Sequence, residues 1–274
     1  MVPGRPRTPR GTPAGGQFAR KVNPERTTEL ASDSTDSGAT REPSAADSPS
    51  PLLRRLFEAA AALQEVVPDA TLVGGSAAAF YAGHRDSYDH DHVIANLADH
   101  YDMVLEAIES QDGWITNRMV PNKLILGEIG DIEAGVRQLI RKTPLEVEQY
   151  QLPSGRVLRV PTSAETLRIK AYLIIARNQT RDYLDVAALS DWMGLSSAAS
   201  VLVDIDHFYA DQHRGGLGVS TQIAVQLADP RPRDAKTTQH LKQYKRLDRR
   251  WHDWNDVRSV CMAVSRLMVE QKDS

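Results

Sequence analysis

Large apolar residues begin to recur at regular spacing directly after Pro51, where the chain changes character. In residues 51–67, PLLRRLFEAAAALQEVV, leucine, alanine and valine return every three or four positions, which predicts an amphipathic helix. The ATLV run that follows is short and closed by two glycines, so it predicts a strand that ends in a turn. The next predicted elements are a helix over 76–85, a strand over 88–95 and a helix over 97–110.

Strand patterns continue to about residue 160, and helical patterns follow them. Residues 122–140, NKLILGEIGDIEAGVRQLI, contain three glycines and predict one or two strands. RVLRV, at 156–160, predicts another strand, which Pro161 closes. From Ser163 onward nearly every segment predicts helix, with breaks near 178–180, 194 and 215–216. The expected fold class is therefore α/β (α+β), a mixed sheet with flanking helices followed by a helical domain.

The chain divides into three expected parts, namely residues 1–50, 51–160 and 161–274. The first is dominated by Pro, Gly, Ser, Thr, Arg and Asp, and predicts a disordered tail because it cannot bury enough apolar surface to offset its ordering entropy. The second is the expected α/β core. The third is the expected helical domain, whose first two helices complete the active site.

Charge and cysteine content narrow the class of protein. The formal net charge is −3, so the chain lacks the overall basic field of a duplex-binding protein. The single cysteine, Cys261, excludes an internal disulfide framework and a Cys-rich zinc site. No apolar run approaches the roughly 20 residues that cross a bilayer, and the basic N-terminus lacks the apolar core of a secretory signal. We therefore expect a cytoplasmic protein without a membrane partner.

The most informative stretch is VGGSAAAFYAGHRDSYDHDHV. Gly74, Gly75 and Ser76 lie where a strand opens into a helix, and glycines there let a phosphate approach free backbone N–H groups. Asp89 and Asp91 point to one face of the predicted strand, about 7 Å apart. Two such carboxylates repel unless a cation lies between them, and Mg²⁺ prefers oxygen ligands shared with phosphates. The pattern predicts phosphoryl or nucleotidyl transfer, against the simpler alternative of a polar turn.

A family resemblance follows from these motifs. Gly-Gly-Ser, a helix and Asp-x-Asp on the next strand resemble the polymerase-β-type nucleotidyltransferase signature. GHRDSYDHD, with ETLRIKAYLIIAR and TRDYLDVAAL downstream, is similar to the AbiEii/AbiGii toxin family, whose members show a GHR-x-S-x-D-x-D run, a lysine helix and an Arg-Asp-x-x-Asp helix. The resemblance implies a nucleotidyltransferase-type sheet and Mg²⁺-dependent transfer from a nucleoside triphosphate to an acceptor hydroxyl. It also implies a type IV toxin–antitoxin or phage-defence component, with the tRNA 3′ end as acceptor and an AbiEi-like antitoxin as partner.

The same resemblance assigns metal and phosphate ligands. Asp89 and Asp91 would hold Mg²⁺ together with Asp131, which lies in an Asp-Ile-x-x-Gly pattern. Glu133 shares a strand face with Asp131 by the period of two, so the choice of third carboxylate stays open. The Gly74-Gly75-Ser76 segment, above all its last two residues, would position the β- and γ-phosphates.

Two residues of the predicted helices have unexpectedly apolar neighbours. Lys170 lies within TLRIKAYLII, where a buried lysine needs an anionic partner, either a carboxylate or a phosphate; snorkelling to the surface is the alternative. Asp185 has the apolar helical neighbours Ala188 and Leu189. By motif, Lys170 would bind the triphosphate and Asp185 would orient or deprotonate the acceptor. Asp182 would stabilise the start of its helix, and Arg181 would either bridge to Asp182 or assist phosphate binding.

Two departures leave other functions open. His90 and His92 replace residues that are usually apolar in the family; they alternate with the aspartates, so they should pack on a helix rather than converge on zinc. Residues 230–258 interleave basic and aromatic side chains. This pattern is typical of a site that binds an RNA end or, equally, of a solvated helix whose tryptophans belong to the core. Two alternatives therefore remain, a small-molecule (antibiotic) nucleotidyltransferase and a catalytically silent nucleotide- or partner-binding relative.

Overall fold

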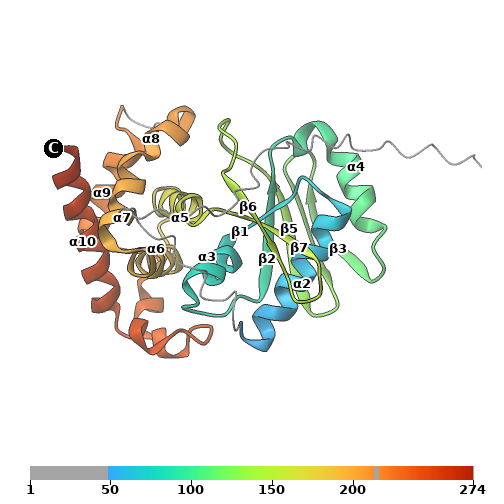
Figure 1. Cartoon of the computed structure of the whole chain (residues 1–274), viewed down its shortest axis with the longest axis horizontal. Coiled ribbons are helices and arrows are strands. Elements are labelled where there is room, and N and C mark those ends of the chain that lie inside the picture. The colour runs from blue at the N-terminus through green and yellow to red at the C-terminus, as the bar shows by residue number, and fades with distance from the viewer. Residues whose placement is uncertain (1–48, 213–215, 274) are drawn as a thin grey trace, which may run out of the picture. The chain divides into compact units, whose positions relative to one another are not determined.

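The computed structural model describes residues 49–212 and 216–273 (Figure 1). The predicted tail over 1–50 falls almost wholly outside these residues. The described part combines a mixed sheet with α-helices, which confirms the expected α/β class.

The main sheet has five strands in the order β1-β2-β5-β4-β3. Their bounds are β1 (Thr71–Val73), β2 (Asp89–Ile94), β5 (Ile132–Gln138), β4 (Leu124–Ile129) and β3 (Trp114–Val120). β2 and β5 pair in parallel at the centre, and the other neighbours are antiparallel. The segment expected to hold one or two strands forms two, β4 and β5.

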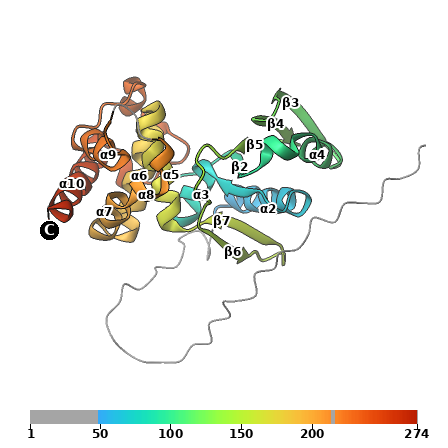
Figure 2. The same cartoon turned by 90° about the horizontal axis from the view of Figure 1, so that it is seen from above.

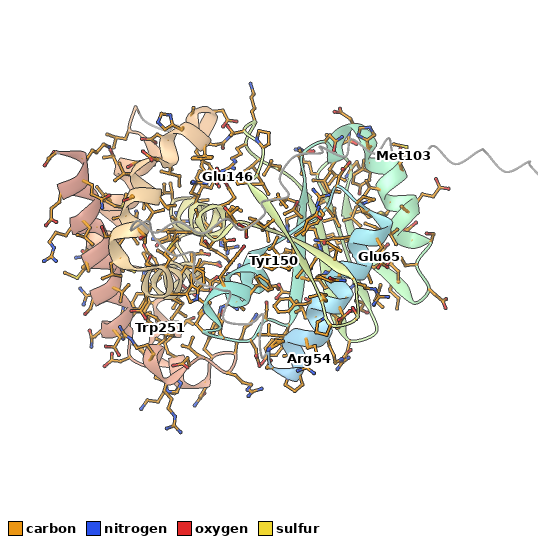
Figure 3. All side chains as sticks on the ribbon, viewed as in Figure 1. Arg54, Glu65, Met103, Glu146, Tyr150 and Trp251 are labelled. Atoms are coloured by element: carbon orange, nitrogen blue, oxygen red, sulfur yellow. The ribbon has the colours of Figure 1, made fainter. Side chains whose placement is uncertain are left out.

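One face of this sheet is covered by α2 (Pro51–Val66) and α4 (Leu97–Glu109). Ile94, Val104 and Val136 belong to the apolar cluster between these helices and the sheet. Met103 of α4 lies on the outer side of its helix, away from the strands (Figure 3). α2 also packs against a hairpin of β6 (Val147–Gln151) and β7 (Val157–Pro161), so it lies between sheet and hairpin (Figure 2).

The opposite end of the sheet meets the helical half through α3 (Gly74–Ala82), which lies between them (Figures 1 and 2). Phe80 and Tyr81 of α3 are buried in the same apolar cluster as Tyr183 and Trp192. The helices that form this half are α5 (Ser163–Arg177), α6 (Thr180–Met193), α7 (Leu195–Val203), α8 (Ile205–Phe208), α9 (Val219–Ala228) and α10 (Trp254–Lys272). One apolar cluster therefore joins α3 to the helical half, and a second cluster lies between the sheet, α2 and α4.

The helical pattern was expected to continue through residues 229–253, and there the prediction was wrong. This segment contains only 3₁₀ turns, η2 (Ala235–Gln239), η3 (Leu241–Gln243) and η4 (Arg249–Trp251). Pro230 and Pro232 lie at its start, where each removes a backbone donor. Trp251 is buried near the start of α10 (Figure 3) and Trp254 packs edge-on against Tyr183, so both rings belong to the core rather than to an exposed stacking surface.

Within residues 49–212 and 216–273, no single helix is long and apolar enough to cross a bilayer. Only α6 and α7 taken together have the necessary length and composition, and that pair is bent by 118°.

The two unusual histidines lie on the helix-facing side of β2. His90 and His92 are buried, and the burial pattern of the strand alternates between them and the aspartates, which confirms the predicted faces. Their rings meet edge to face at 5.2 Å. Across the described residues, no group of three or more His, Cys, Asp or Glu is placed to hold a metal ion. Burial lowers the pKa of His90 to about 4 and the pKa of His92 well below its ordinary value.

These lowered pKa values predict acid sensitivity of the fold. His92 stays neutral when folded but takes up a proton near pH 6.5 when unfolded, so below that pH the unfolded chain binds more protons and the free energy of unfolding decreases. As the pH falls below 6.5, the free energy of unfolding of His92→Leu should decrease by about 1.4 kcal/mol less per pH unit than that of the wild-type protein. Urea unfolding at several pH values measures this difference. Parallel pH profiles for the two proteins would contradict this account.

Candidate active site

The Gly-Gly pair joins β1 directly to α3. β1 ends at Val73 and α3 begins at Gly74, whose φ of 76° is a backbone conformation that side chains disfavour. A Cβ on Gly75 would lie 2.6 Å from a guanidinium nitrogen of Arg85, so any other residue would push that guanidinium away from Asp185, which holds it. Both glycines line a pocket, and the first backbone N–H groups of α3 have no side-chain cap.

This pocket has a volume of about 640 Å³ and two walls of opposite charge. The wall formed by β2 and β5 carries three carboxylates, those of Asp89, Asp91 and Glu133. The wall formed by α5 and α6 carries three cations, those of Lys170, Arg177 and Arg181. The start of α3 lies at the edge between the two walls.

The two aspartates remain partly exposed, and only loosely held cations contact them. Asp91 lies beside Gly135, where a Cβ would come 2.6 Å from its Oδ1, and Arg137 approaches that oxygen at 3.5 Å. Asp89 accepts a hydrogen bond from the Ser87 hydroxyl at 3.2 Å. The exposed side-chain fractions are 42% for Asp89 and 29% for Asp91, so both carboxylates are open to a ligand.

The register of the sheet bears on whether Asp131 or Glu133 is the third carboxylate of the predicted metal site. Glu133 pairs with Asp89 across the parallel β2–β5 ladder, so the two side chains share a face. Asp131 precedes β5 in the β4–β5 turn, is 72% exposed and pairs with Arg55 of α2 at 2.7 Å. It does not line the pocket, whereas Glu133 does. The position of Asp131 therefore gives no support to its predicted metal role.

Ser76 also has a different contact from the one expected. Its side chain is fully buried and donates a hydrogen bond to the backbone carbonyl of Asp89 at 2.5 Å. The residue is not among those that line the pocket. Ser76 thus fixes the start of β2 relative to α3, and its hydroxyl is not available to a phosphate.

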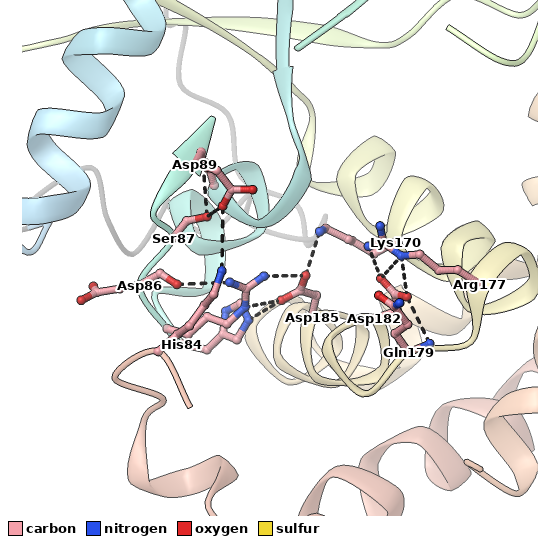
Figure 4. A network of polar contacts seen from close by, with 12 residues as sticks. His84, Asp86, Ser87, Asp89, Lys170, Arg177, Gln179, Asp182 and Asp185 are labelled. Atoms are coloured by element: carbon pink, nitrogen blue, oxygen red, sulfur yellow. Dashed lines mark hydrogen bonds and ion pairs between the residues drawn. The ribbon is translucent and has the colours of Figure 1, made fainter. Parts of the chain in front are cut away.

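Asp185 lies at the centre of a buried ion network behind the pocket (Figure 4). Arg85 donates two hydrogen bonds to its carboxylate, from Nε to Oδ1 at 2.8 Å and from Nη2 to Oδ2 at 3.0 Å. His84 Nε2 lies 2.8 Å from Oδ1, and Lys170 Nζ lies 2.7 Å from Oδ2. The network joins the loop before β2 to α5 and α6.

These contacts give no support to the predicted role of Asp185 as a base. A carboxylate offers about four lone-pair positions, and all four are taken. Burial alone would raise the pKa of Asp185, but the Arg85 and Lys170 cations hold it well below the usual range. Burial lowers the pKa of His84, so a neutral ring donates its Nε2–H to the carboxylate. Asp185 is therefore the shared counter-ion that positions Arg85 and Lys170.

The predicted anionic partner of Lys170 is confirmed as a carboxylate. Lys170 is buried, yet it also lines the pocket, so its charge lies just beneath the basic wall. The neighbouring Arg177 binds Asp182 through both carboxylate oxygens, at 2.6 to 3.1 Å. Asp182 also closes the capping box at the start of α6. Arg181 makes no ion pair with any residue described here and lines the pocket, which leaves its guanidinium available to a ligand.

Sequence reasoning missed four pocket-lining or supporting residues, His84, Arg85, Arg177 and Lys245. The buried position predicted for Asp185 was a usable signal, since a buried carboxylate needs a cation and the quoted GHR motif supplies one. Lys245 belongs to the basic and aromatic segment noted in the sequence, but that pattern could not place it at the pocket, because the segment lies more than 150 residues from Asp89 along the chain.

Comparison with known proteins gives partial likenesses. No family model matches the chain. It is 40% identical over 131 residues to the mycolic acid-containing lipids exporter MmpL11 of Mycolicibacterium smegmatis, and 40% identical over 133 residues to the heme uptake protein MmpL11 of Mycobacterium tuberculosis. Each match covers 48% of this chain and 13% of the relative, so the chain spans about an eighth of those proteins.

Solved structures with a similar backbone include nucleotidyltransferases. The nucleotidyltransferase toxin MenT4 of Mycobacterium tuberculosis aligns with a TM-score of 0.47 at 18% identity, over 81% of this chain and 91% of that one. A putative nucleotidyltransferase from H. pylori gives 0.45 at 15% identity, over 80% and 95%. The antibiotic-resistance factor ANT(2″)-Ia gives 0.42 at 15% identity, over 58% and 93%. With TM-scores below 0.5, these likenesses add nothing to what the pocket's own residues show.

The buried network predicts a difference in stability between two conservative variants. Asp185→Asn leaves buried Arg85 and Lys170 without their shared counter-ion, which should cost about 3–5 kcal/mol in the free energy of unfolding. Asp89→Asn changes a half-exposed carboxylate and should cost less than about 1 kcal/mol. Urea unfolding of both variants tests this. Equal midpoints for Asp185→Asn and the wild-type protein would show that the network is not structural.

Proposed function

We propose that this protein is a Mg²⁺-dependent nucleotidyltransferase that takes a nucleoside triphosphate as substrate. The observation that carries the proposal is the pocket with an acidic wall on the sheet, a basic wall on the helices and an uncapped helix start between them. A metal-bound triphosphate presents matching charges, because its cation faces carboxylates and its phosphate oxygens face arginine, lysine and backbone N–H groups.

The carboxylates fit a hard divalent cation by their chemistry. Asp89, Asp91 and Glu133 offer only oxygen ligands, share one sheet face and line the pocket. Among the described residues they are not placed to hold a metal ion by themselves, so the proposal requires waters and substrate phosphates to complete the shell of the cation. When bound there, Mg²⁺ would neutralise the charge that develops on the transferring and leaving phosphates. Glu133 replaces Asp131 in this assignment.

The opposite wall would hold the phosphate chain. The backbone N–H groups at Gly74 and Gly75 and the uncommitted guanidinium of Arg181 are the groups that would donate hydrogen bonds to phosphate oxygens. Lys170 would contribute mainly through its field, because Asp185 holds its amine. Arg85, beneath Gly75, would act in the same way.

The reaction would be an in-line displacement at the α-phosphate. An acceptor hydroxyl forms the new O–P bond while the bond from the α-phosphorus to the bridging oxygen breaks and pyrophosphate leaves. Since Asp185 has no free lone pair, the proton of the acceptor is assigned to a carboxylate of the acidic wall. This is chemistry of the EC 2.7.7 type.

The acceptor is assigned from motif resemblance. GHRDSYDHD and the two downstream helices resemble the AbiEii/AbiGii family, which favours a type IV toxin or phage-defence component that modifies tRNA 3′ ends. An AbiEi-like antitoxin protein would then be its partner, and the cytoplasm, where tRNA and nucleoside triphosphates meet, would be its location.

Label transfer tests the proposal. Purified protein with Mg²⁺, total tRNA and each α-³²P nucleoside triphosphate in turn should label RNA with one nucleotide, and Asp89→Asn should lower the rate on the order of 10²–10³-fold. Label on an added aminoglycoside instead of RNA would keep the transferase and replace the acceptor. Absence of transfer to any acceptor, with nucleotide binding still measurable, would reject the enzyme in favour of a binding protein.

Variants of Glu133 and Asp131 test which of the two residues is the third metal-binding carboxylate. Glu133→Gln should lower nucleotidyl transfer on the order of 10²-fold, because it removes a charge from the acidic wall. Asp131→Asn should stay within about twofold of wild type, because its exposed pair with Arg55 contributes little. The opposite ranking in the same assay would restore Asp131 as the metal ligand.

A further inference from the structure

The segment that contains Lys245 is attached to the loop beside the pocket. The backbone N–H of Asp86 donates to the carbonyl of Lys245 at 2.9 Å, and the N–H of Asp248 donates to the carbonyl of His84 at 2.8 Å. Arg246 adds an ion pair to Asp86 at 3.5 Å. Because these bonds join residues 84–86 to residues 245–248, the C-terminal segment has a fixed position at the pocket.

The backbone of this segment adopts a costly conformation. Lys245 and Arg246 are consecutive non-glycine residues with φ values of 41° and 47°, in the left-handed region. A chain keeps such a conformation only where surrounding contacts impose it, and it is found preferentially at functional sites. Here the contacts are those to residues 84–86, and their effect is to direct the Lys245 side chain toward the acidic wall.

The Lys245 amine lies among groups of the pocket. It is 3.9 Å from Oδ1 of Asp89 and 5.3 Å from the centre of the Tyr88 ring, and its side chain is 30% exposed. The pair is therefore loose and solvated, so a stronger ligand of Asp89 can displace the amine at little cost. Arg137, opposite Asp91 at 3.5 Å, belongs to the sheet itself, whereas Lys245 comes from a separate segment.

We propose that Lys245 is a substrate-binding residue that neutralises Asp89 in the free protein and turns to the phosphate groups when a metal-bound triphosphate enters. This inference rests on the proposed function. A divalent cation at Asp89 repels an amine that lies 3.9 Å from the same oxygen. The flexible lysine then moves, and the new anion within its reach is the triphosphate, whose charge a point-charge ammonium can follow.

The proposal predicts that one substitution, Lys245→Met, strengthens metal binding and weakens phosphate binding. Lys245→Met keeps most of the chain length but removes the charge, so we expect it to bind Mn²⁺ alone about two- to fivefold more tightly than wild type. The same variant should bind Mg²⁺-tripolyphosphate about fivefold more weakly, because a phosphate ligand is lost. The Mn²⁺ affinity is measured from the free-ion electron paramagnetic resonance signal, and tripolyphosphate binding by calorimetry. Tripolyphosphate removes any dependence on the unidentified base.

Lys242→Met is the matched control, because Lys242 is exposed in the same segment and does not line the pocket. It should match wild type in both measurements. Unchanged or weaker Mn²⁺ binding by Lys245→Met would overturn the proposal, and so would unchanged tripolyphosphate binding. If the wild-type protein still binds both ligands, either result leaves the proposed function intact. Failure of wild type to bind Mn²⁺ and tripolyphosphate would instead overturn the proposed function and this inference together.

Discussion

The carboxylate of Asp185 is the group on which the arrangement of the pocket depends. It is fully buried and accepts contacts from His84, Arg85 and Lys170, which come from the loop before β2 and from α5. Because α6 carries the carboxylate, one anion joins the sheet end of the molecule to the first two helices of the helical half. Removing it would leave buried cations unpaired, so the pocket and the core share their stability.

The acidic residues around the pocket divide into two kinds. Asp182 and Asp185 are buried and bound closely by internal cations, at distances down to 2.6 and 2.7 Å respectively, and have no capacity left for a ligand. Asp89 and Asp91 are partly exposed and meet cations only at 3.9 and 3.5 Å. The first kind holds the basic wall in place, and the second kind is open to a metal ion. Residue type alone therefore does not tell whether an aspartate near the pocket binds an internal cation or is open to a metal ion.

Much of this arrangement could be predicted from periodicity, and the failures have physical causes. The alternation of Asp89, His90, Asp91 and His92 assigned each side chain to its correct face, because the period of a strand leaves no other choice. β3 and β6 were missed because none of the residues in WITNRMV or VEQYQ is fully buried, so neither strand shows a regular buried face. The sequence does not give the register between β2 and β5. For this reason the choice between Glu133 and Asp131 as the third carboxylate needed the structure, which pairs Glu133 with Asp89.

The central claim is that the acidic wall holds a metal ion and the opposite wall holds the triphosphate. A crystal structure with Mn²⁺ and a non-hydrolysable α,β-methylene nucleoside triphosphate tests this most directly, because manganese can be located by its anomalous scattering. The account predicts a manganese peak at Asp89, Asp91 and Glu133, with the phosphates at the Gly74-Gly75 N–H groups and Arg181. A metal and nucleotide bound elsewhere, with Lys245 still paired to Asp89, would contradict it.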